Sequence, residues 1–506
     1  MHRDRGAYNL ATRFLDQDPD RTALLGPTGP LTYGELTALT NRIGNVLLDV
    51  GVRPGDRVLL ALADGVEFVA AWFAAQKIGA VTAETYTFLT VKDYAYYLNY
   101  TDATAVIADS ITLDRLREAG ARDRARLVVG PADLRDGEHD LDALAAAASS
   151  SLDSAPVGPD DVVLWKFTTG STGAPKACPH TARSPLAGFD GYARGVLGLG
   201  PDDVVLPVPK LFFGYARDLA ALYPFGVGGA GIVFPERTTP ERVFALIAEH
   251  RPTVLVNVPT MMAAMVAHPL ADDQDLSCLR LCTSAGEALP PELHRKWHNT
   301  FGVEVVDGIG SSELYHIYIS NRPGSTRTGS IGSLVPGYTA RVVDPDGQDV
   351  PDGEIGTLEV TGSTAALEYV GDAEKSATTF LGDGTVHTGD LVSRDPDGTF
   401  RYRGRADDLL KVSGIWVAPS EIEHCLIGHP DVVECAVLGR ERDGLVRPYA
   451  FVVVSAPGID PDDLRRYVRE RLSPHKTPER VVFVDELPRT TNGKLDRRAL
   501  RTLDAS

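Results

Sequence analysis

The residues from Thr168 to Lys176 form the most specific chemical pattern in the chain. They combine hydroxyl residues and glycines with one lysine, and they follow an apolar run, 162–167, that is typical of a strand. Glycines let backbone N–H groups turn toward an anion, while hydroxyls add donors and lysine adds charge. The pattern predicts a phosphate-binding loop. It differs from the nucleotide P-loop because Pro175 and Ala177 flank the lysine. A flexible surface turn is the alternative.

Four further segments join carboxylates, hydroxyls or lysine to glycine turns. They are residues 307–313, 388–391, 404–414 and 491–495. A carboxylate such as Glu313 is a suitable ligand for Mg²⁺ on a phosphate substrate. Asp390 could accept hydrogen bonds from a ribose diol. Each segment also has an ordinary interpretation: Asp390 could cap a helix, and Glu313 and Lys494 could be solvated surface charges.

Length, charge and cysteine content limit the class of protein. A chain of 506 residues is too long for one core, so two or more domains are expected. The net charge of −19 argues against a general nucleic-acid binder. No apolar run could span a bilayer and the N-terminus lacks a signal-peptide core, so a cytoplasmic protein is expected. Five widely spread cysteines indicate reduced thiols rather than a disulfide framework or a zinc site.

Strand-like and helix-like segments alternate through most of the chain, which predicts α/β layers with largely parallel sheets. The clearest are strands at 57–62, 79–83 and 253–258 and helices at 67–77 and 240–250. Between about 332 and 403, short strands separated by turns predict a small β-rich subdomain. A compact α+β pattern follows from about Asp407, with helices at 419–427 and 461–472 and strands at 432–438 and 446–454.

Together and in this order, these motifs resemble the adenylate-forming superfamily of acyl-CoA synthetases, peptide-synthetase adenylation domains and luciferases. The resemblance covers nearly the whole chain. Within it, segments 210–215, 258–260, 307–313 with His316, and 407–414 look like the benzoate-CoA ligase and aryl-CoA ligase branch. The resemblance implies a large N-terminal domain at 1–404, a hinge at 405–408 and a mobile α+β C-terminal lid at 409–506.

The implied activity has two steps and uses ATP, Mg²⁺ and coenzyme A. An aryl or bulky cyclic carboxylic acid attacks the α-phosphate of ATP, which gives an acyl-adenylate and pyrophosphate. The thiol of coenzyme A then displaces AMP. Dimers are common in the aryl-ligase branch, so a homodimer is compatible with the resemblance.

The resemblance also assigns residues to roles. Those implied for ATP or AMP are Thr168, Thr169, Gly170, Ser171, Thr172, Gly173, Lys176, Gly286, Glu287, Ala288, Asp307, Gly308, Ile309, Gly310, Asp390 and Arg405. Those implied for catalysis are Lys494, Ser312 and Glu313, with Glu313 also binding Mg²⁺. Asp407 matches the hinge residue, and Ser413 and Gly414 match the coenzyme A tunnel. The acyl pocket is expected to include Phe213, Gly214, Tyr215 and His316, together with Gly308 and Gly310.

Departures from the family pattern leave alternatives open. Arg217 and Asp218 replace small or apolar residues, which indicates either a more polar acid or a structural ion pair. Ala177 stands where the family usually has glycine, and the segment 365–369 departs from the family pattern. A protein that runs mainly the thioester-forming half, or one that loads a separate carrier protein, is therefore an alternative. An oxidoreductase is a remote alternative. Residues 226–231 match the GxGxxG dinucleotide-binding pattern, but they precede a strand-like segment rather than a helix.

Overall fold

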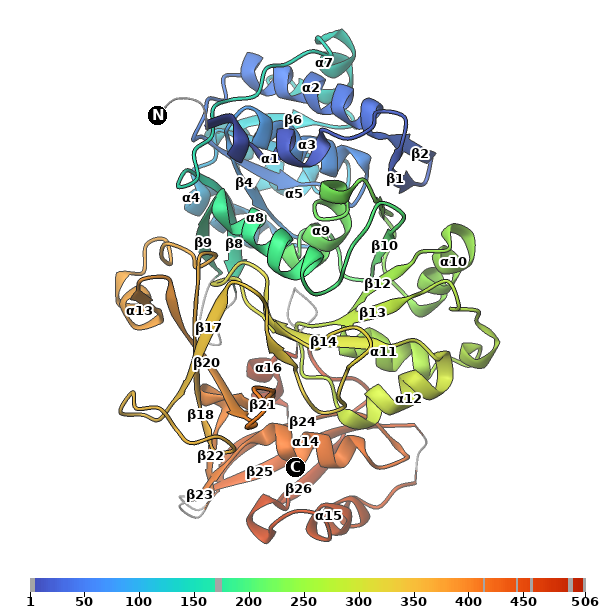
Figure 1. Cartoon of the computed structure of the whole chain (residues 1–506), viewed down its shortest axis with the longest axis vertical. Helices are drawn as coiled ribbons and strands as arrows, with labels where there is room; N and C mark the ends of the chain where they lie inside the picture. Colours follow the sequence, from blue (N-terminus) through green and yellow to red (C-terminus); the bar gives the residue numbers. More distant parts are fainter. Residues whose placement is uncertain are drawn as a thin grey trace.

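The computed structural model describes residues 5–168, 175–412, 415–442, 445–455, 458–489 and 495–503. Figure 1 shows the N-terminal α/β layers at one end of the molecule and the C-terminal α+β elements at the other. The described strands form two large, mainly parallel sheets and three smaller sheets. The α/β class and the separate small β sheets predicted from the sequence are confirmed.

Seven of the described strands form the first large sheet. In spatial order they are β7 (His139–Asp140), β6 (Arg126–Val129), β5 (Ala105–Ala108), β3 (Arg57–Ala61), β4 (Val81–Glu84), β8 (Val162–Thr168) and β9 (Lys176–Thr181). All neighbours are parallel except β8 and β9. Successive residues such as Leu59 and Leu60 enter different cores. The sheet is therefore buried on both faces, as parallel sheets require.

Helices cover the two faces of this sheet separately. On one face lie α2 (Tyr33–Asp49), α3 (Val66–Lys77) and α7 (Leu141–Ala147), and on the other lie α4 (Val91–Thr101), α5 (Leu113–Glu118) and α6 (Ala121–Arg124). Thr32 and Thr90 begin α2 and α4 with capping boxes, which satisfy N–H groups that the first turn leaves free. These caps fix where each helix starts above the sheet.

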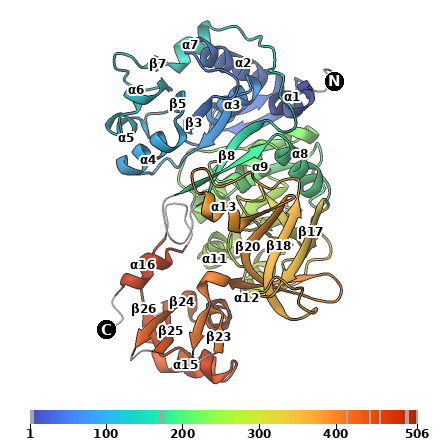
Figure 2. The ribbon, with the colours of Figure 1, turned by 90° about the vertical axis from the view of Figure 1, so that its left-hand side faces the viewer.

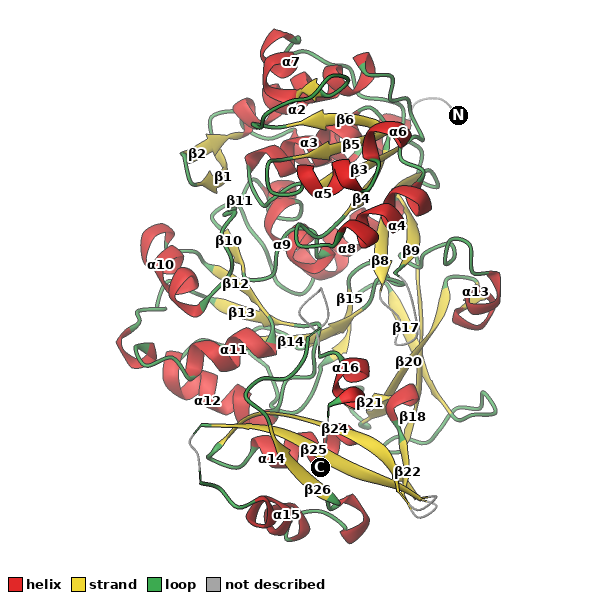
Figure 3. Ribbon diagram, turned by 180° about the vertical axis from the view of Figure 1, so that it is seen from behind, coloured by secondary structure: helices red, strands yellow, loops and turns green. Residues whose placement is uncertain are grey.

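Nine of the described strands form the second large sheet. In spatial order they are β16 (Ser333–Leu334), β15 (Ile317–Ser320), β14 (Val305–Gly310), β13 (Leu281–Ser284), β12 (Val254–Asn257), β10 (Val204–Pro207), β11 (Ala230–Ile232), β1 (Thr22–Gly26) and β2 (Gly29–Thr32). Its outer face packs on α10 (Pro240–His250), α11 (Pro259–Val266) and α12 (Pro291–Phe301). Between the two sheets lie α1 (Leu10–Leu15), α3, α8 (Arg183–Gly188) and α9 (Gly214–Ala221), which share one core with both. Figure 3 shows this layering from behind.

The smaller sheets follow in sequence. β17 (Tyr338–Val343), β18 (Ile355–Gly362), β20 (Thr385–Arg394), β19 (Phe380–Gly382) and β21 (Phe400–Arg405) form an antiparallel sheet beside α13 (Ala373–Thr379). After the helical turn Ala406–Asp408 come β22 (Leu410–Val412), β23 (Ile415–Val417), α14 (Pro419–Ile427), β24 (Val432–Arg442), β25 (Leu445–Val454), α15 (Pro461–Arg469), β26 (Arg480–Phe483) and α16 (Arg497–Thr502). In Figure 2 the elements from β22 to α16 lie below the large sheets. They are separate from β17, β18 and β20.

Several predicted elements are confirmed, and others begin or end elsewhere. The strand expected at 432–438 continues to Arg442 as β24. The helices expected at 240–250 and 419–427 are α10 and α14. The strand expected at 79–83 begins only at Val81, because Gly79 has a φ of 73°, which is incompatible with a strand. The helix expected to reach 472 ends at Arg469. As the sequence predicted, the segment 226–231 leads into a strand, β11, and not into a helix.

Two further expectations concern membranes and cysteines. No helix within the described ranges is both long and apolar enough to cross a membrane. All five cysteines are free thiols.

Candidate active site

A cleft of about 2630 Å³ opens between the large sheets and the elements that follow Arg405. Every predicted site residue that the structure describes lines it. These residues are Thr168, Lys176, Phe213, Gly214, Tyr215, Gly286, Glu287, Ala288, Asp307, Gly308, Ile309, Gly310, Ser312, Glu313, His316, Asp390, Arg405 and Asp407. The remaining predicted residues lie outside the described ranges: Thr169, Gly170, Ser171, Thr172, Gly173, Ser413, Gly414 and Lys494.

The expected phosphate loop is anchored at the ends of two paired strands. Thr168 closes β8 and pairs with Lys176 at the start of β9. The Lys176 ammonium lies 2.7 Å from Asp372 Oδ2 and 5.3 Å from the centre of the Tyr369 ring. The same tyrosine donates its hydroxyl to Glu313 Oε1 at 2.7 Å. Tyr369 therefore contacts both the predicted phosphate lysine and the predicted magnesium ligand.

The turn that carries Ser312 and Glu313 is tightly held. Its Tyr315 has a φ of 71°, a left-handed conformation that bulky residues rarely adopt. The buried His180 ring lies 2.7 Å from the carbonyl oxygen of Ser312 through Nε2, and the Ser312 hydroxyl donates to Phe167. A Cβ on Gly310 would come within 2.6 Å of the His316 carbonyl oxygen, so this position requires glycine. The turn is thus fixed against both β8 and β9.

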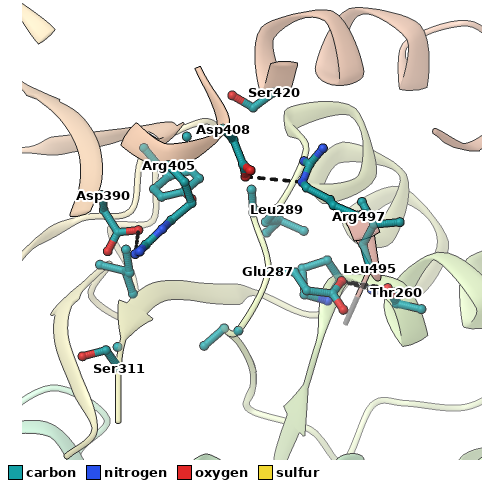
Figure 4. Close-up of a pocket in the computed structure, with 18 of the residues that line it drawn as sticks. Thr260, Glu287, Leu289, Ser311, Asp390, Arg405, Asp408, Ser420, Leu495 and Arg497 are labelled. Atoms are coloured by element: carbon teal, nitrogen blue, oxygen red, sulfur yellow. Dashed lines mark hydrogen bonds and ion pairs between the residues drawn. The ribbon is translucent and has the colours of Figure 1, made fainter. Parts of the chain in front are cut away.

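Asp390 and Arg405 form an ion pair on two neighbouring strands. Arg405 Nη1 lies 3.1 Å from Asp390 Oδ1 and also donates to the carbonyl of Thr388, as Figure 4 shows for the ion pair. The turn predicted at 388–391 is instead an irregularity within β20: Gly389 has a φ of 70° where the pairing with β18 shifts, and Asp390 lines the cleft. Burial raises the pKa of Asp390, and Arg405 opposes that shift. The pair presents a carboxylate with a second oxygen for a ligand, which suits a diol.

Residues from the C-terminal elements close the opposite wall. Arg489 Nη1 donates to Thr260 Oγ1 at 3.2 Å, and Thr260 donates its hydroxyl to Glu287 Oε2 at 2.7 Å. Arg497 lies 3.3 Å from Asp408, the last residue of the predicted hinge (Figure 4). The Arg489–Thr260 hydrogen bond joins the two sides of the cleft directly.

His316, one of the predicted acyl residues, is buried among tyrosine rings. His316 is 3% exposed, and neither of its ring nitrogens has a hydrogen-bond partner among the described residues. The rings of Tyr192, Tyr215 and Tyr223 lie within 6 Å of it, centre to centre. Burial lowers the pKa of His316 to about 3, so the ring is neutral at pH 7. An unpaired buried imidazole in an aromatic pocket indicates a ligand-facing group.

Beside this pocket lies a network of four buried charges. Lys166 Nζ is 2.9 Å from Asp218 Oδ2 and donates to the Tyr315 carbonyl at 2.5 Å. Arg217 pairs with both Asp218 and Glu84. Burial by itself would raise the pKa of Asp218, but Arg217 and Lys166 outweigh it and lower the pKa to about 2. The charged pair that the sequence singled out is therefore buried and mutually neutralised.

Among the cleft-lining residues that sequence reasoning missed are Lys166, Glu84 and Tyr369. Lys166 was treated as part of an apolar strand, although a lysine inside such a run was itself a signal. Glu84 and Tyr369 had no comparable local signal, because long-range packing brings them to the site.

The site suits magnesium bound mainly through phosphate. Within the described residues no group of three or more His, Cys, Asp or Glu side chains could hold a metal ion. Mg²⁺ usually takes one or two protein carboxylates together with substrate phosphates and water. Glu313 fits that requirement, because Oε1 accepts from Tyr369 and no described residue donates to Oε2.

Comparison with known families shows which family the chain belongs to. A profile described as "AMP-binding enzyme" matches residues 11–370, and one described as "AMP-binding enzyme C-terminal domain" matches 421–494. The chain belongs to the AMP-binding enzyme family. The first match spans both large sheets and the cleft-lining residues up to Tyr369. The C-terminal match begins within α14, beyond the predicted hinge.

Relatives of this AMP-binding enzyme match along their whole length. A benzoate–CoA ligase of Thauera aromatica is 39% identical, covering 98% of this chain and 96% of its own. A 4-hydroxybenzoate–CoA/benzoate–CoA ligase of Rhodopseudomonas palustris is 38% identical, with 98% and 94% covered. Among solved structures, an anthranilate CoA ligase in complex with anthranoyl-AMP has a TM-score of 0.93 at 35% identity, covering 98% and 96%. A benzoate CoA ligase from Burkholderia xenovorans has a TM-score of 0.90 at 38% identity, covering 98% and 99%.

Proposed function

We propose that this AMP-binding enzyme is an arenecarboxylate–coenzyme A ligase that works through an acyl-adenylate. One observation carries the proposal: the Asp390–Arg405 pair, Glu313 and Lys176 line the same cleft as an aromatic pocket with an unpaired buried histidine. Full-length similarity to benzoate–CoA and hydroxybenzoate–CoA ligases supports it. Its substrates are an aryl acid, ATP and coenzyme A.

In the first step, a carboxylate oxygen attacks the α-phosphorus of ATP, the bond to the bridging oxygen breaks, and pyrophosphate leaves. The segment from Thr168 to Lys176 holds the β- and γ-phosphates, and Lys176 exchanges Asp372 for phosphate oxygen. Asp390 and Arg405 grip the ribose, and 286–288 and 307–310 border the adenine. Ser312 and Glu313 contact phosphate, and Glu313 would hold Mg²⁺, which would supply positive charge to the phosphates. Lys494 stabilises the charge that grows on the α-phosphate.

In the second step, the coenzyme A thiolate attacks the acyl carbon and AMP leaves. The two steps need different groups beside the same carbonyl, which a rotating lid can supply. We propose that residues 409–506 rotate about Asp407 relative to 1–404, which places Ser413 and Gly414 along the path of the thiol. The hydrogen bond of Arg489 with Thr260 crosses the cleft, and interfaces between domains of one chain commonly allow relative motion.

Pyrophosphate exchange tests the proposal. We expect exchange with at least one benzoate in a panel of aromatic, aliphatic and polycyclic acids, and a thioester when coenzyme A is added. Exchange without transfer to coenzyme A would favour a separate carrier protein as acceptor. Thioester formed only from synthetic acyl-adenylate would favour an enzyme of the second half-reaction. Inactivity in both formats would overturn the ligase proposal.

The assembly and the location are separate proposals. We propose a homodimer, which sedimentation equilibrium would test directly. A cytoplasmic location fits an enzyme that consumes ATP and coenzyme A, and fractionation of the producing cells would test it.

A further inference from the structure

Two charged side chains border the acyl pocket at the ends of neighbouring strands. Glu84 ends β4, and Lys166 lies on β8, one residue beyond the paired residues Ala83 and Trp165. Both side chains line the cleft, and they are only 4% and 7% exposed. The ends of parallel strands are where α/β proteins bind ligands. The wall of this pocket therefore carries a buried polar patch.

Both side chains keep hydrogen-bonding capacity that the described residues do not use. Glu84 Oε1 accepts from the Trp72 indole at 2.7 Å and from Arg217, but no described donor reaches Oε2. An ammonium has three N–H donors, and Lys166 directs two of them to Asp218 and the Tyr315 carbonyl. One acceptor and one donor thus remain. Buried polar groups rarely stay unsatisfied, so a ligand or water is expected to take them.

The charge balance limits what such a ligand can be. Glu84 and Asp218 carry two negative charges, and Lys166 and Arg217 carry two positive ones. A carboxylate or ammonium added here would leave one buried charge uncompensated, which is strongly unfavourable. A neutral group that both accepts and donates satisfies the patch.

Gly214 places the ammonium against the predicted acyl pocket. A Cβ at this position would lie 2.6 Å from Lys166 Nζ, so the lysine occupies the space of a side chain at the start of α9. Gly214 and Lys166 both line the cleft. The lysine is therefore within the wall of the acyl pocket and not behind it.

We propose that Lys166 and Glu84 form a subsite selecting an arenecarboxylic acid with a neutral hydroxyl or amino group on the ring. Lys166 donates to the lone pair of the substituent, and the substituent donates its O–H or N–H to Glu84 Oε2. The inference rests on the proposed ligase function and specifies its substrate class. Benzoate and its methyl derivatives leave both protein groups unpaired, so they are poorer substrates.

The wild-type enzyme provides the first test. Specificity constants are measured for benzoate and for the hydroxy-, amino- and methylbenzoates at each ring position. We expect roughly 10- to 100-fold preference for hydroxyl or amino over methyl at one position, the range for hydrogen bonds to charged groups. Equal or better use of the methyl acids at every position would overturn the subsite. If no acid of the panel supports exchange, the ligase proposal itself fails, which is a separate outcome.

The double variant Lys166→Met/Asp218→Asn is the second test. It removes the donor while Glu84 and Arg217 still neutralise each other. We expect the polar-to-methyl ratio to fall to about one while turnover of the methyl acid persists. An unchanged polar-to-methyl ratio would overturn the assignment of Lys166 as the donor. The control is Lys210→Met, a lysine that donates to the Phe234 carbonyl outside the cleft lining and should leave the ratio unchanged.

Gly214→Ala keeps the proposal testable if the double variant does not fold. The added methyl group displaces the ammonium without altering any charge. We expect the same loss of preference between polar and methyl acids. An unchanged ratio in a folded Gly214→Ala enzyme would contradict the placement of the donor.

Discussion

The two ends of the cleft hold their charges in different ways. At the nucleotide end, Lys176 and Arg405 are 27% and 43% exposed, and each has one carboxylate partner. In the acyl wall, Lys166, Arg217 and Asp218 are at most 7% exposed and share partners. Exposed pairs contribute little and exchange readily, whereas a buried charge depends on each of its partners. The nucleotide end is therefore built for exchange of ligands and the acyl wall for a fixed shape.

The largest effect is expected where the acyl wall loses a central charge. Arg217→Met leaves Glu84 and Asp218 buried without their common partner, which should cost about 3–5 kcal/mol of unfolding free energy. Denaturant unfolding measures the loss. As control, Arg194→Met removes an exposed pair with Asp190 and should cost less than about 1 kcal/mol. Equal losses in both variants would contradict the dependence of the acyl wall on its buried charges.

At the nucleotide end, the largest effect should be on rate and not on folding. Lys494→Ala should slow adenylation roughly 100- to 1000-fold, because one preorganised charge at the α-phosphate is lost. Thioester formation from a supplied acyl-adenylate should be largely spared. Pyrophosphate exchange and the thioester assay separate the two steps. Lys476→Ala, which removes a pair with Glu421, should affect neither. Equal loss of both steps would refute the role of Lys494.

The neutral character of the acyl pocket should appear in the pH dependence of stability. Burial lowers the pKa of His316 to about 3 from its ordinary 6.5. Between these values the unfolded chain binds a proton that the folded chain excludes, so stability falls as pH falls. One such histidine contributes up to about 1.4 kcal/mol per pH unit. His316→Asn should reduce the slope of unfolding free energy between pH 6.5 and 3. An unchanged slope would mean that the ring is protonated in the fold.

The smallest effect is expected from a single hydroxyl at the nucleotide end. Tyr369→Phe keeps the ring beside Lys176 but removes the hydrogen bond to Glu313. A roughly 10- to 100-fold lower kcat/KM for ATP should result, the range for one hydrogen bond to a charged group. Tyr467→Phe, which loses a bond to the Gly428 carbonyl away from the cleft, is the control. A loss in kcat/KM above 100-fold would show that Tyr369 does more than position Glu313 and Lys176.

Local patterns predicted most of the fold and the nucleotide end of the site. The helix at α10 and the strand at β8 follow from periodicity and caps within a few residues. The segments around Glu313 and Asp390 are short and contiguous, so their chemistry is visible in the sequence. The start of β4 was misplaced because the left-handed φ of Gly79 depends on how the chain turns between α3 and the sheet.

The sequence by itself determined the α/β class, the order of the motifs and the residue types that can bind a nucleotide, because these depend on neighbours along the chain. Only the tertiary structure decided that Arg217 and Asp218 neutralise Lys166 and Glu84. The contact between Arg217 and Glu84 joins residues 133 positions apart. Whether a charged residue is a surface group, a ligand contact or a buried partner depends on what surrounds it after folding, since burial sets its electrostatic cost.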